Sequence, residues 1–328
     1  MMQRRGILKA LVAGSLLLGA VSPVLGQTDN FPSRPASMVV GWSPGGATDI
    51  LARQLVEAMS AVAGESFVVE NRPGANGTIG HGRVARERPD GYTSLLATNS
   101  TFAIAPHLYE NLPFEQEKDF APVSLLAESP LLLVASTQVG VENLDELVQK
   151  MSEQEGGLNV ASGGNGSTSH MAAEMLMSVT GSSMTHIPYK GGGPAAAAIA
   201  SGEVDVAFLD FGVALPFLKS GQAVPIGVTS AERSPLLAEV PSLQEAGLDD
   251  FVATTTFGLF VPADTPAEVV DRLSSITQQA LKDSKLSKQL ESQGVVVIGT
   301  DAQGLADYVN EETRRWGELI EERDIKIE

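Results

Sequence analysis

The chain of 328 residues contains no cysteine. Disulfides, thiolate metal ligands and a lipid-modified N-terminal cysteine are therefore excluded, and the fold must be stabilised by its core. The histidines are few and show no i,i+4 pairing of the kind that a helical metal site uses; they are His81, His107, His170 and His186. We therefore expect neither a metal nor another cofactor.

Positive charge is also scarce, with 22 Lys and Arg against 40 Asp and Glu and a formal net charge of −18. A chain this acidic does not attract nucleic acid or anionic lipid through its overall field. An anionic ligand would have to be held by local dipoles against that field.

Long apolar runs are missing except near the start of the chain. Arg4, Arg5 and Lys9 precede an apolar run over 10–21, Pro23 follows, and Gly26 ends a small-residue cleavage signal. This layout predicts an export signal over residues 1–26, read by the general or the twin-arginine route, with cleavage before residue 27. A membrane anchor is the alternative, but the run is short for a span of about 20 residues. We expect a free protein in the periplasm.

Short apolar runs alternate with helical patterns along the remaining chain, which favours an α/β fold with parallel strands and crossover helices. The predicted strands are Met38–Val40, Ser66–Glu70, Thr93–Ala97, Leu158–Ala161, Met184–Ile187, Val204–Leu209, Ala223–Val228 and Val295–Ile298. The predicted helices are Ile50–Val62, Leu144–Met151, Ser169–Val179, Pro194–Ser201, Ala267–Asp283, Leu286–Gln293 and Gly304–Arg323. The acids of the last helix are expected on a solvated face.

Two extended regions indicate crossings between two domains. Asp119–Ser136 reads as two extended runs separated at Pro130, and Thr254–Val261 is the second region. We predict a discontinuous first lobe over 27–127 and 256–328, with a second lobe inserted over 128–255. Two crossings make a hinge, and strand ends would face the cleft between the lobes.

Three glycine-rich loops connect a strand to the start of a helix. They read VVGWSPGGATD at 39–49, LNVASGGNGSTSH at 158–170 and IPYKGGGP at 187–194. A helix N-terminus offers unpaired N–H groups and the positive end of the helix dipole, which favours an anion. We therefore predict binding of a small carboxylate and no catalysis.

The candidate ligand-binding residues follow from these loops and from the ends of other predicted strands. They are Trp42, Gly45, Gly46, Thr48, Asn76, Gly77, Asn99, Ser162, Gly163, Gly166, Ser167, His170, Tyr189, Lys190, Gly191 and Asp210. Trp42 is expected at the cleft wall, with a place in the lobe core as the alternative, and Trp316 is expected far from the ligand. Asp49 would repel an anion, so we interpret it as a helix cap or a partner for local N–H groups.

Several of these residues have more than one interpretation. Lys190 either attracts the ligand or is a solvated cation, and Asp210 either accepts from a ligand ammonium or hydroxyl group or tethers Lys190. Arg72 adjoins Glu70 and is interpreted as solvated or paired. Ser167 and His170 suggest a hydrolase of small esters as an alternative, but no nucleophile-elbow motif surrounds the serine.

Six motifs occur in an order that resembles one known family. They read GGATD at 45–49, ENRPGANGTIG at 70–80, PHLYENLPFEQEKDFAP at 106–122, SGGNGSTSHMAAE at 162–174, HIPYKGGGPAAAAIASGEVD at 186–205 and RSPLLAEVPSLQE at 233–245. The chain resembles the Bug-type substrate-binding receptors of tripartite tricarboxylate transporters. It departs from their pattern at Trp42, where Phe or Tyr is usual, and at Asn76, where glycine is frequent.

The resemblance implies a two-lobed Venus-flytrap fold of the periplasmic-binding-protein type, similar to type II. It also implies delivery of a di- or tricarboxylate, an amino acid or a related organic acid to the membrane permease subunits of such a transporter. Presentation of the ligand to a sensor kinase is an alternative use of the same binding chemistry. We expect a monomer.

Overall fold

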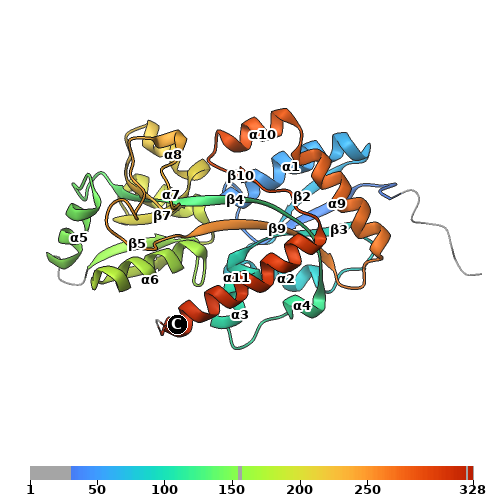
Figure 1. The fold of residues 1–328 in the computed structure, drawn as a ribbon, viewed down its shortest axis with the longest axis horizontal. Helices are drawn as coiled ribbons and strands as arrows, with labels where there is room; N and C mark the ends of the chain where they lie inside the picture. Colours follow the sequence, from blue (N-terminus) through green and yellow to red (C-terminus); the bar gives the residue numbers. More distant parts are fainter. Residues whose placement is uncertain (1–30, 154–156, 323, 328) are drawn as a thin grey trace, which may run out of the picture.

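The computed structural model describes residues 31–153, 157–322 and 324–327, so the predicted export signal over 1–26 lies outside the described residues. Two lobes lie side by side along the longest axis, joined by strands that run through the middle (Figure 1). None of the described helices combines the length and the hydrophobicity that crossing a membrane requires.

The first lobe is built on a sheet with the strand order β2-β1-β3-β9-β4, with β10 on the far side of β4. Its strands are β1 (Ala36–Val40), β2 (Phe67–Asn71), β3 (Thr93–Thr98), β9 (Thr254–Pro262), β4 (Phe120–Ser136) and β10 (Val296–Val297). β1 pairs parallel with β2 and β3, as predicted. β9 runs antiparallel to both β3 and β4, so the sheet is mixed.

Helices cover both faces of this sheet. They are α1 (Ala47–Ala63), α2 (Thr78–Val84), α3 (Ala105–Leu108), α4 (Gln116–Asp119), α9 (Ala267–Leu281), α10 (Ser284–Glu291) and α11 (Ala302–Glu322). A 3₁₀ turn (Ala75–Gly77) and a π-helical turn (Ser100–Ile104) precede α2 and α3. α1 packs on α9 on one face, and α11 crosses the other face against β4.

The second lobe shares β4 with the first. Its other strands are β5 (Leu158–Ser162), β6 (Met184–Pro188), β7 (Val206–Asp210) and β8 (Ala223–Val228). Its helices are α5 (Leu144–Glu153), α6 (Thr168–Thr180), α7 (Gly192–Ser201) and α8 (Phe211–Lys219), with a 3₁₀ turn at Pro235–Leu237. α8 was absent from the sequence-based prediction. β5 is parallel to β6 and β7, whereas β4 pairs antiparallel with β7 and β8.

β4 is one strand of 17 residues, where the sequence predicted two separate runs. Its residues Phe120–Pro130 pair with β9 in the first lobe, and Leu131–Ala135 pair with β7 in the second. Backbone pairing therefore continues through the predicted break at Pro130. The domain limits over 27–127, 128–255 and 256–328 stay predictions. The first predicted crossing between the lobes falls on β4, and the second falls near the start of β9.

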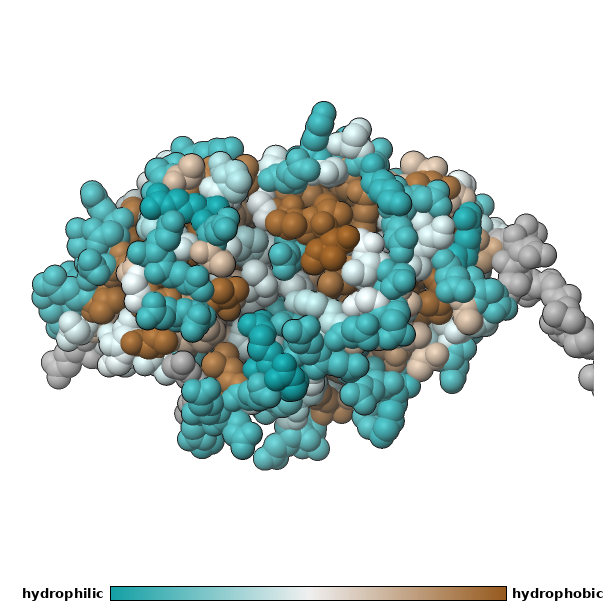
Figure 2. Space-filling model, viewed as in Figure 1, coloured by the Kyte–Doolittle hydropathy of each residue, from teal (hydrophilic) through white to brown (hydrophobic). Residues whose placement is uncertain are grey.

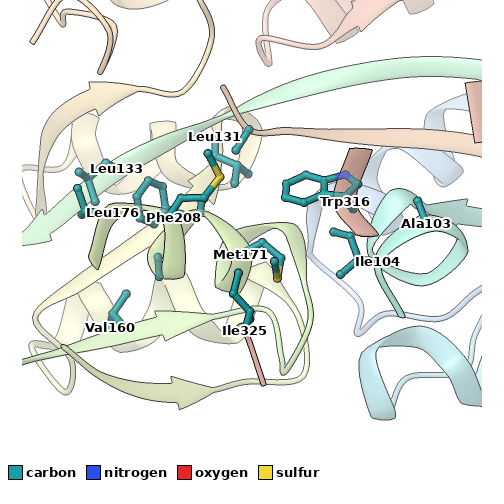
Figure 3. Close-up of a cluster of buried hydrophobic side chains, with 14 of the residues drawn as sticks. Ala103, Ile104, Leu131, Leu133, Val160, Met171, Leu176, Phe208, Trp316 and Ile325 are labelled. Atoms are coloured by element: carbon teal, nitrogen blue, oxygen red, sulfur yellow. The ribbon is translucent and has the colours of Figure 1, made fainter. Parts of the chain in front are cut away.

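Three hydrophobic clusters form the core. One lies between the first-lobe sheet and α1 and α9, and another lies under α7 and α8 of the second lobe. The third runs through both lobes along the side of α11 and α6 (Figure 3). Trp316 of α11 is fully buried in this third cluster, which also holds Ile104, Leu131 and Met171. Trp316 therefore packs where the lobes meet. It lines neither cavity between the lobes, and its expected distance from the ligand stays a prediction.

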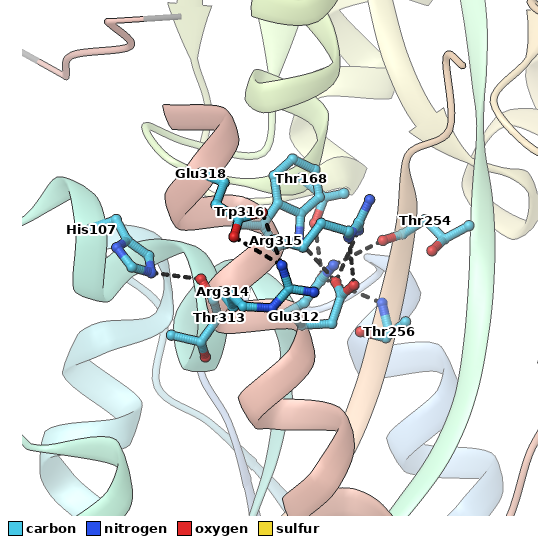
Figure 4. Close-up of polar contacts among 11 residues, drawn as sticks. His107, Thr168, Thr254, Thr256, Glu312, Thr313, Arg314, Arg315, Trp316 and Glu318 are labelled. Atoms are coloured by element: carbon cyan, nitrogen blue, oxygen red, sulfur yellow. Dashed lines mark hydrogen bonds and ion pairs between the residues drawn. The ribbon is translucent and has the colours of Figure 1, made fainter. Parts of the chain in front are cut away.

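Glu312 of α11 is 6% exposed, which corrects its predicted place on a solvated face. Its carboxylate accepts from Trp316 Nε1 at 2.8 Å and from the Arg315 guanidinium at 2.7 Å and 3.0 Å (Figure 4). These charge-assisted bonds compensate the loss of hydration that burial imposes on a carboxylate.

Exposed hydrophobic side chains gather in a hollow near β10 (Figure 2). They include Val296, Ile298 and Leu236, of which Val296 is 53% exposed. A groove there is lined by residues of both lobes, including Pro130 and Leu236. Its width therefore depends on how the two lobes are set relative to one another.

Candidate functional site

A small cavity of about 50 Å³ lies between the lobes. One water needs roughly 10–15 Å³ of such space, so the cavity has room for a few waters or a small organic molecule. Its lining comprises Trp42, Gly46, Ala47, Thr48, Thr98, Ser100, Leu131, Gly163, Ser167, Thr168, Ser169, Gly192, Phe208, Leu209, Asp210 and Thr255. No Lys or Arg occurs in that set.

Four helices begin at the cavity, namely α1, α6, α7 and α8, and the N-cap of α8 is Asp210. The N-caps of α1 and α7 are Gly46 and Gly191, so neither helix has a capping side chain that accepts from its first N–H groups. The two glycine loops approach closely, because a Cβ built on Gly193 would lie 3.2 Å from the carbonyl of Gly45. The free N–H groups and the dipoles of both helices make this region suited to an anion.

Asp49, in the first turn of α1, organises the first loop from within. Its carboxylate accepts from the Gly45 N–H at 3.0 Å and from Asn71 Nδ2 at 2.9 Å, and it pairs with Arg53. Burial opposes its ionisation, but these partners outweigh burial and lower the pKa of Asp49. The predicted role as a partner for local N–H groups is confirmed, and the Gly45 donor is already used.

The second loop also satisfies most of its polar groups internally. The Gly163 N–H donates to Ser169 Oγ at 2.9 Å, and Ser162 Oγ lies 2.6 Å from His186 Nε2. Ser167 Oγ accepts from the backbone N–H of His170, which caps α6. Only part of this loop is therefore available to a ligand.

His170 is committed to structural contacts. Its Nδ1 accepts from the Gly166 N–H at 3.1 Å, and its Nε2 lies 3.2 Å from Glu174. Its ring stacks on His186 with the centroids 3.9 Å apart. Burial and the neighbouring His170 lower the pKa of His186 to about 4. With both ring nitrogens of His170 engaged elsewhere, it does not act as a base toward the Ser167 hydroxyl.

Cross-lobe hydrogen bonds close the cavity. Thr168 of α6 donates its N–H to Ser100 Oγ at 2.9 Å and its hydroxyl to Asn99 Oδ1 at 2.9 Å. Asn99 is fully buried and also donates to the Thr254 carbonyl where β9 begins. Further out, the Tyr109 hydroxyl donates to the Asn165 carbonyl at 2.9 Å. The two lobes are therefore in a closed arrangement.

Asp210 is the charged side chain of the cavity lining. Its Oδ1 is buried without a hydrogen-bond partner in the described part of the chain. Burial raises the pKa of Asp210 to about 6, against the opposing effect of Thr255, Ser129 and its own backbone N–H. Thr98 Oγ1, in the same lining, is likewise buried and unpartnered.

Trp42 lines this cavity and an outer one of about 350 Å³. It is 8% exposed and also belongs to the first-lobe core, so both interpretations of its position apply. The outer cavity is lined by Asn76, Gly77, Gly163, Tyr189 and Lys190 among others. Tyr189 donates to Glu203, and Lys190 is exposed. The outer cavity adjoins the inner one at Trp42 and Gly163, which line both.

The predicted site residues thus divide into three groups. Trp42, Gly46, Thr48, Gly163, Ser167 and Asp210 line the inner cavity, and Asn76, Gly77, Tyr189 and Lys190 line the outer one. Gly45, Asn99, Ser162, Gly166, His170 and Gly191 line neither and shape the loops around them. The sequence analysis missed Leu131, Phe208 and Thr255, which come from strands that a glycine-loop search does not reach.

Residues 51–325 match the model of the tripartite tricarboxylate transporter family receptor. The chain belongs to this family. It is 35% identical over 317 residues to a UPF0065 protein encoded in the tcbD-tcbE intergenic region of Pseudomonas sp. (strain P51), covering 96% of this chain and 94% of that protein. The alignment therefore covers nearly the whole length of both this receptor and that relative.

Two solved structures place the receptor among periplasmic binding proteins. The periplasmic binding protein BugD superposes with a TM-score of 0.87 at 34% identity, covering 90% of this chain and 99% of that one. MatC from Rhodopseudomonas palustris with bound malate superposes with a TM-score of 0.85 at 34% identity, covering 88% and 100%. The predicted two-lobed fold and the Bug-type resemblance are confirmed. These relatives are solute-binding proteins and not enzymes.

Proposed function

We propose that this receptor captures a small carboxylate between its lobes in the periplasm and delivers it to the membrane permease subunits of a tripartite tricarboxylate transporter. The observation that carries the proposal is the cavity at which α1, α6 and α7 begin, without a cationic side chain in its described lining. The ligand carboxylate accepts from first-turn N–H groups of α1 and α7, and Trp42 covers its carbon chain.

The magnitude is adequate for capture. A hydrogen bond to a charged acceptor contributes about 1.5–3 kcal/mol, so four or five of them, less the ordering costs, support micromolar binding. The relatives are consistent with this chemistry, since MatC holds malate. Closure of the lobes excludes water and strengthens each of these bonds.

A thermal-shift screen of mono-, di- and tricarboxylates and amino acids tests the binding step. Stabilisation grows as RT ln(1 + [L]/Kd), or about 2.7 kcal/mol at a hundredfold excess over Kd. We expect Gly46→Pro to weaken binding strongly, because it removes an N–H at a φ of −84° that proline nearly matches. Arg72→Ala is the matched control, since Arg72 pairs with Glu70 at the surface and lines neither cavity.

If no carboxylate stabilises the protein, the binding proposal is wrong. If Arg72→Ala weakens binding as much as Gly46→Pro, recognition by backbone dipoles is wrong. Delivery is tested separately in vesicles that contain the permease subunits. Uptake of labelled ligand that does not depend on added receptor would contradict that step.

A further inference from the structure

The inner cavity contains two kinds of polar group that no ligand with a single function can satisfy. The starts of α1 and α7 offer N–H donors, which suit a carboxylate. The wall formed by β4 and β7 holds Asp210, whose Oδ1 lacks a partner and accepts but cannot donate when ionised. A plain carboxylate at this wall would face a like charge.

The surroundings of Asp210 supply no cation to neutralise it. The groups that favour its ionised form are Thr255, Ser129 and its own backbone N–H at the start of α8, and all are uncharged. No Lys or Arg is found among the described lining residues, and none of the ion pairs in the described part of the chain involves Asp210. A desolvated carboxylate requires a counter-charge or a proton to be stable.

Thr98 provides a second, independent observation. Its side chain is on β3 of the first lobe and is 1% exposed, and its Oγ1 has no hydrogen-bond partner within the described residues. The Thr98 hydroxyl oxygen lines the same cavity as Asp210 and can accept a second hydrogen bond from a donor group that binds Asp210. Each lobe therefore contributes one hydrogen-bond acceptor without a partner to the inner cavity, namely Thr98 Oγ1 and Asp210 Oδ1.

We propose that Asp210 pairs with a ligand ammonium group, so that the preferred ligand is a small amino carboxylate whose carboxylate meets the starts of α1 and α7. An ammonium group has three donors, which serve Asp210 Oδ1 and Thr98 Oγ1 together, and it also neutralises the buried charge. A ligand hydroxyl would satisfy Oδ1 but would leave that charge uncompensated. This inference rests on the proposed carboxylate-binding function.

The proton on Asp210 gives the inference a distinct readout. The elements packed on β7 carry other titratable groups, namely His170 and Glu174 on α6, Lys219 on α8 and Glu128 on β4. None of them is among the causes of the shifted pKa of Asp210, which burial raises and Thr255, Ser129 and its own backbone N–H lower. A change in affinity near pH 6 that depends on residue 210 is therefore assignable to this carboxyl group.

Calorimetry at pH 7.5 with matched triplets tests the inference. The first triplet is aspartate, malate and succinate, and the second is alanine, lactate and propionate, which differ in amine, hydroxyl or neither. We expect the amine member of at least one triplet to bind about 30- to 100-fold tighter than the member with neither, the range of a charge-assisted bond. Asp210→Asn should remove that preference and leave the amine-free member within about threefold.

Glu128→Gln is the matched control, because Glu128 is a partly buried acid on β4 that does not line the cavity. It should retain the full preference for the amine. Folding of Asp210→Asn is checked by its melting temperature at pH 7.5. It should be equal to or above that of the wild type, because an acid with a raised folded-state pKa loses stability when it ionises.

The pH dependence separates the rival outcomes. For an amine ligand, wild-type affinity should fall up to about tenfold per pH unit below pH 6, and Asp210→Asn should show no such fall. Equal binding of the amine and hydroxyl members, or succinate binding that strengthens as the pH falls, would overturn the inference while leaving carboxylate capture intact. Failure of every member of both triplets to bind would instead count against the proposed function.

Discussion

Gly193→Ala should weaken ligand binding through a contact that forms when the lobes close. Gly193 lies in the first turn of α7, directly before Pro194. Alanine is favoured over glycine inside a helix by up to about 1 kcal/mol, but a side chain directly before proline is disfavoured in the helical region, so the two effects oppose one another in the lobe itself. The cost arises only when the lobes close.

The magnitude follows from the contact between the two glycine loops. The added Cβ would lie 3.2 Å from the C and O atoms of Gly45 and 3.4 Å from the N atom of Gly46. These are backbone atoms, so they cannot rotate away as a side chain would. Overpacking of this kind costs about 1–3 kcal/mol. Because about 1.4 kcal/mol corresponds to a tenfold change, affinity should fall roughly 5- to 150-fold.

Calorimetry with a ligand identified in the thermal-shift screen measures the loss of affinity, and melting curves of the ligand-free proteins measure the effect on the lobe. If Gly193→Ala binds as tightly as the wild type, the close approach of the two loops is not needed in the bound state and this reasoning is refuted.

Other predictions concern the closed state and the buried rings. Tyr109→Phe removes the cross-lobe bond to Asn165, so ligand dissociation in stopped flow should be about 2- to 10-fold faster, and an unchanged rate would contradict its role in holding the lobes together. Burial lowers the pKa of His81 to about 3. Between pH 6.5 and 3 the unfolded chain therefore binds more protons at His81 than the folded chain does, and the free energy of unfolding falls as the pH falls. Melting curves of His81→Phe should show a pH slope that is shallower by up to about 1.4 kcal/mol per unit, and an unaltered slope would refute this assignment. Trp42 lines the cavity and Trp316 packs where the lobes meet, so the fluorescence response to ligand should be reduced but not erased in Trp42→Phe, and complete loss would show that Trp316 does not sense closure. Small-angle scattering should give a smaller radius of gyration with saturating ligand, and identical curves would argue against closure.

The sequence predicted local structure best where the pattern was strictly local. The helix over 50–62 and the strand over 66–70 occur as α1 and β2 within a few residues, because period and glycine boundaries define them. β4 was divided in two because Pro130 reads as a break. Proline is tolerated there because Pro130 pairs with Thr254 at the very start of β9, where the ladder ends. α8 was missed because its helical run contains Pro216.

The site could be predicted only in outline. Glycines before a helix located the starts of α1, α6 and α7 at the cavity, but not the start of α8 and not which donors are free. Gly45 and Gly163 already donate to Asp49 and Ser169, and those contacts depend on the folded loops. Leu131 and Thr255 enter the lining because β4 and β9 cross between the lobes, which is a tertiary property with no local signal.

The single long strand β4 has a consequence for how the molecule comes apart. The first part of β4 is a strand of the first-lobe sheet, and its last part is a strand of the second-lobe sheet. The hydrophobic cluster beside β4 contains Trp316 from α11 of the first lobe and Met171 from α6 of the second. If either sheet unfolded, the other sheet would lose the continuity of β4, on which part of its own backbone pairing depends. Thermal denaturation should therefore proceed as one cooperative transition. A fragment comprising residues 128–255 alone lacks the first part of this strand and most of β9, so it should not fold as an autonomous unit.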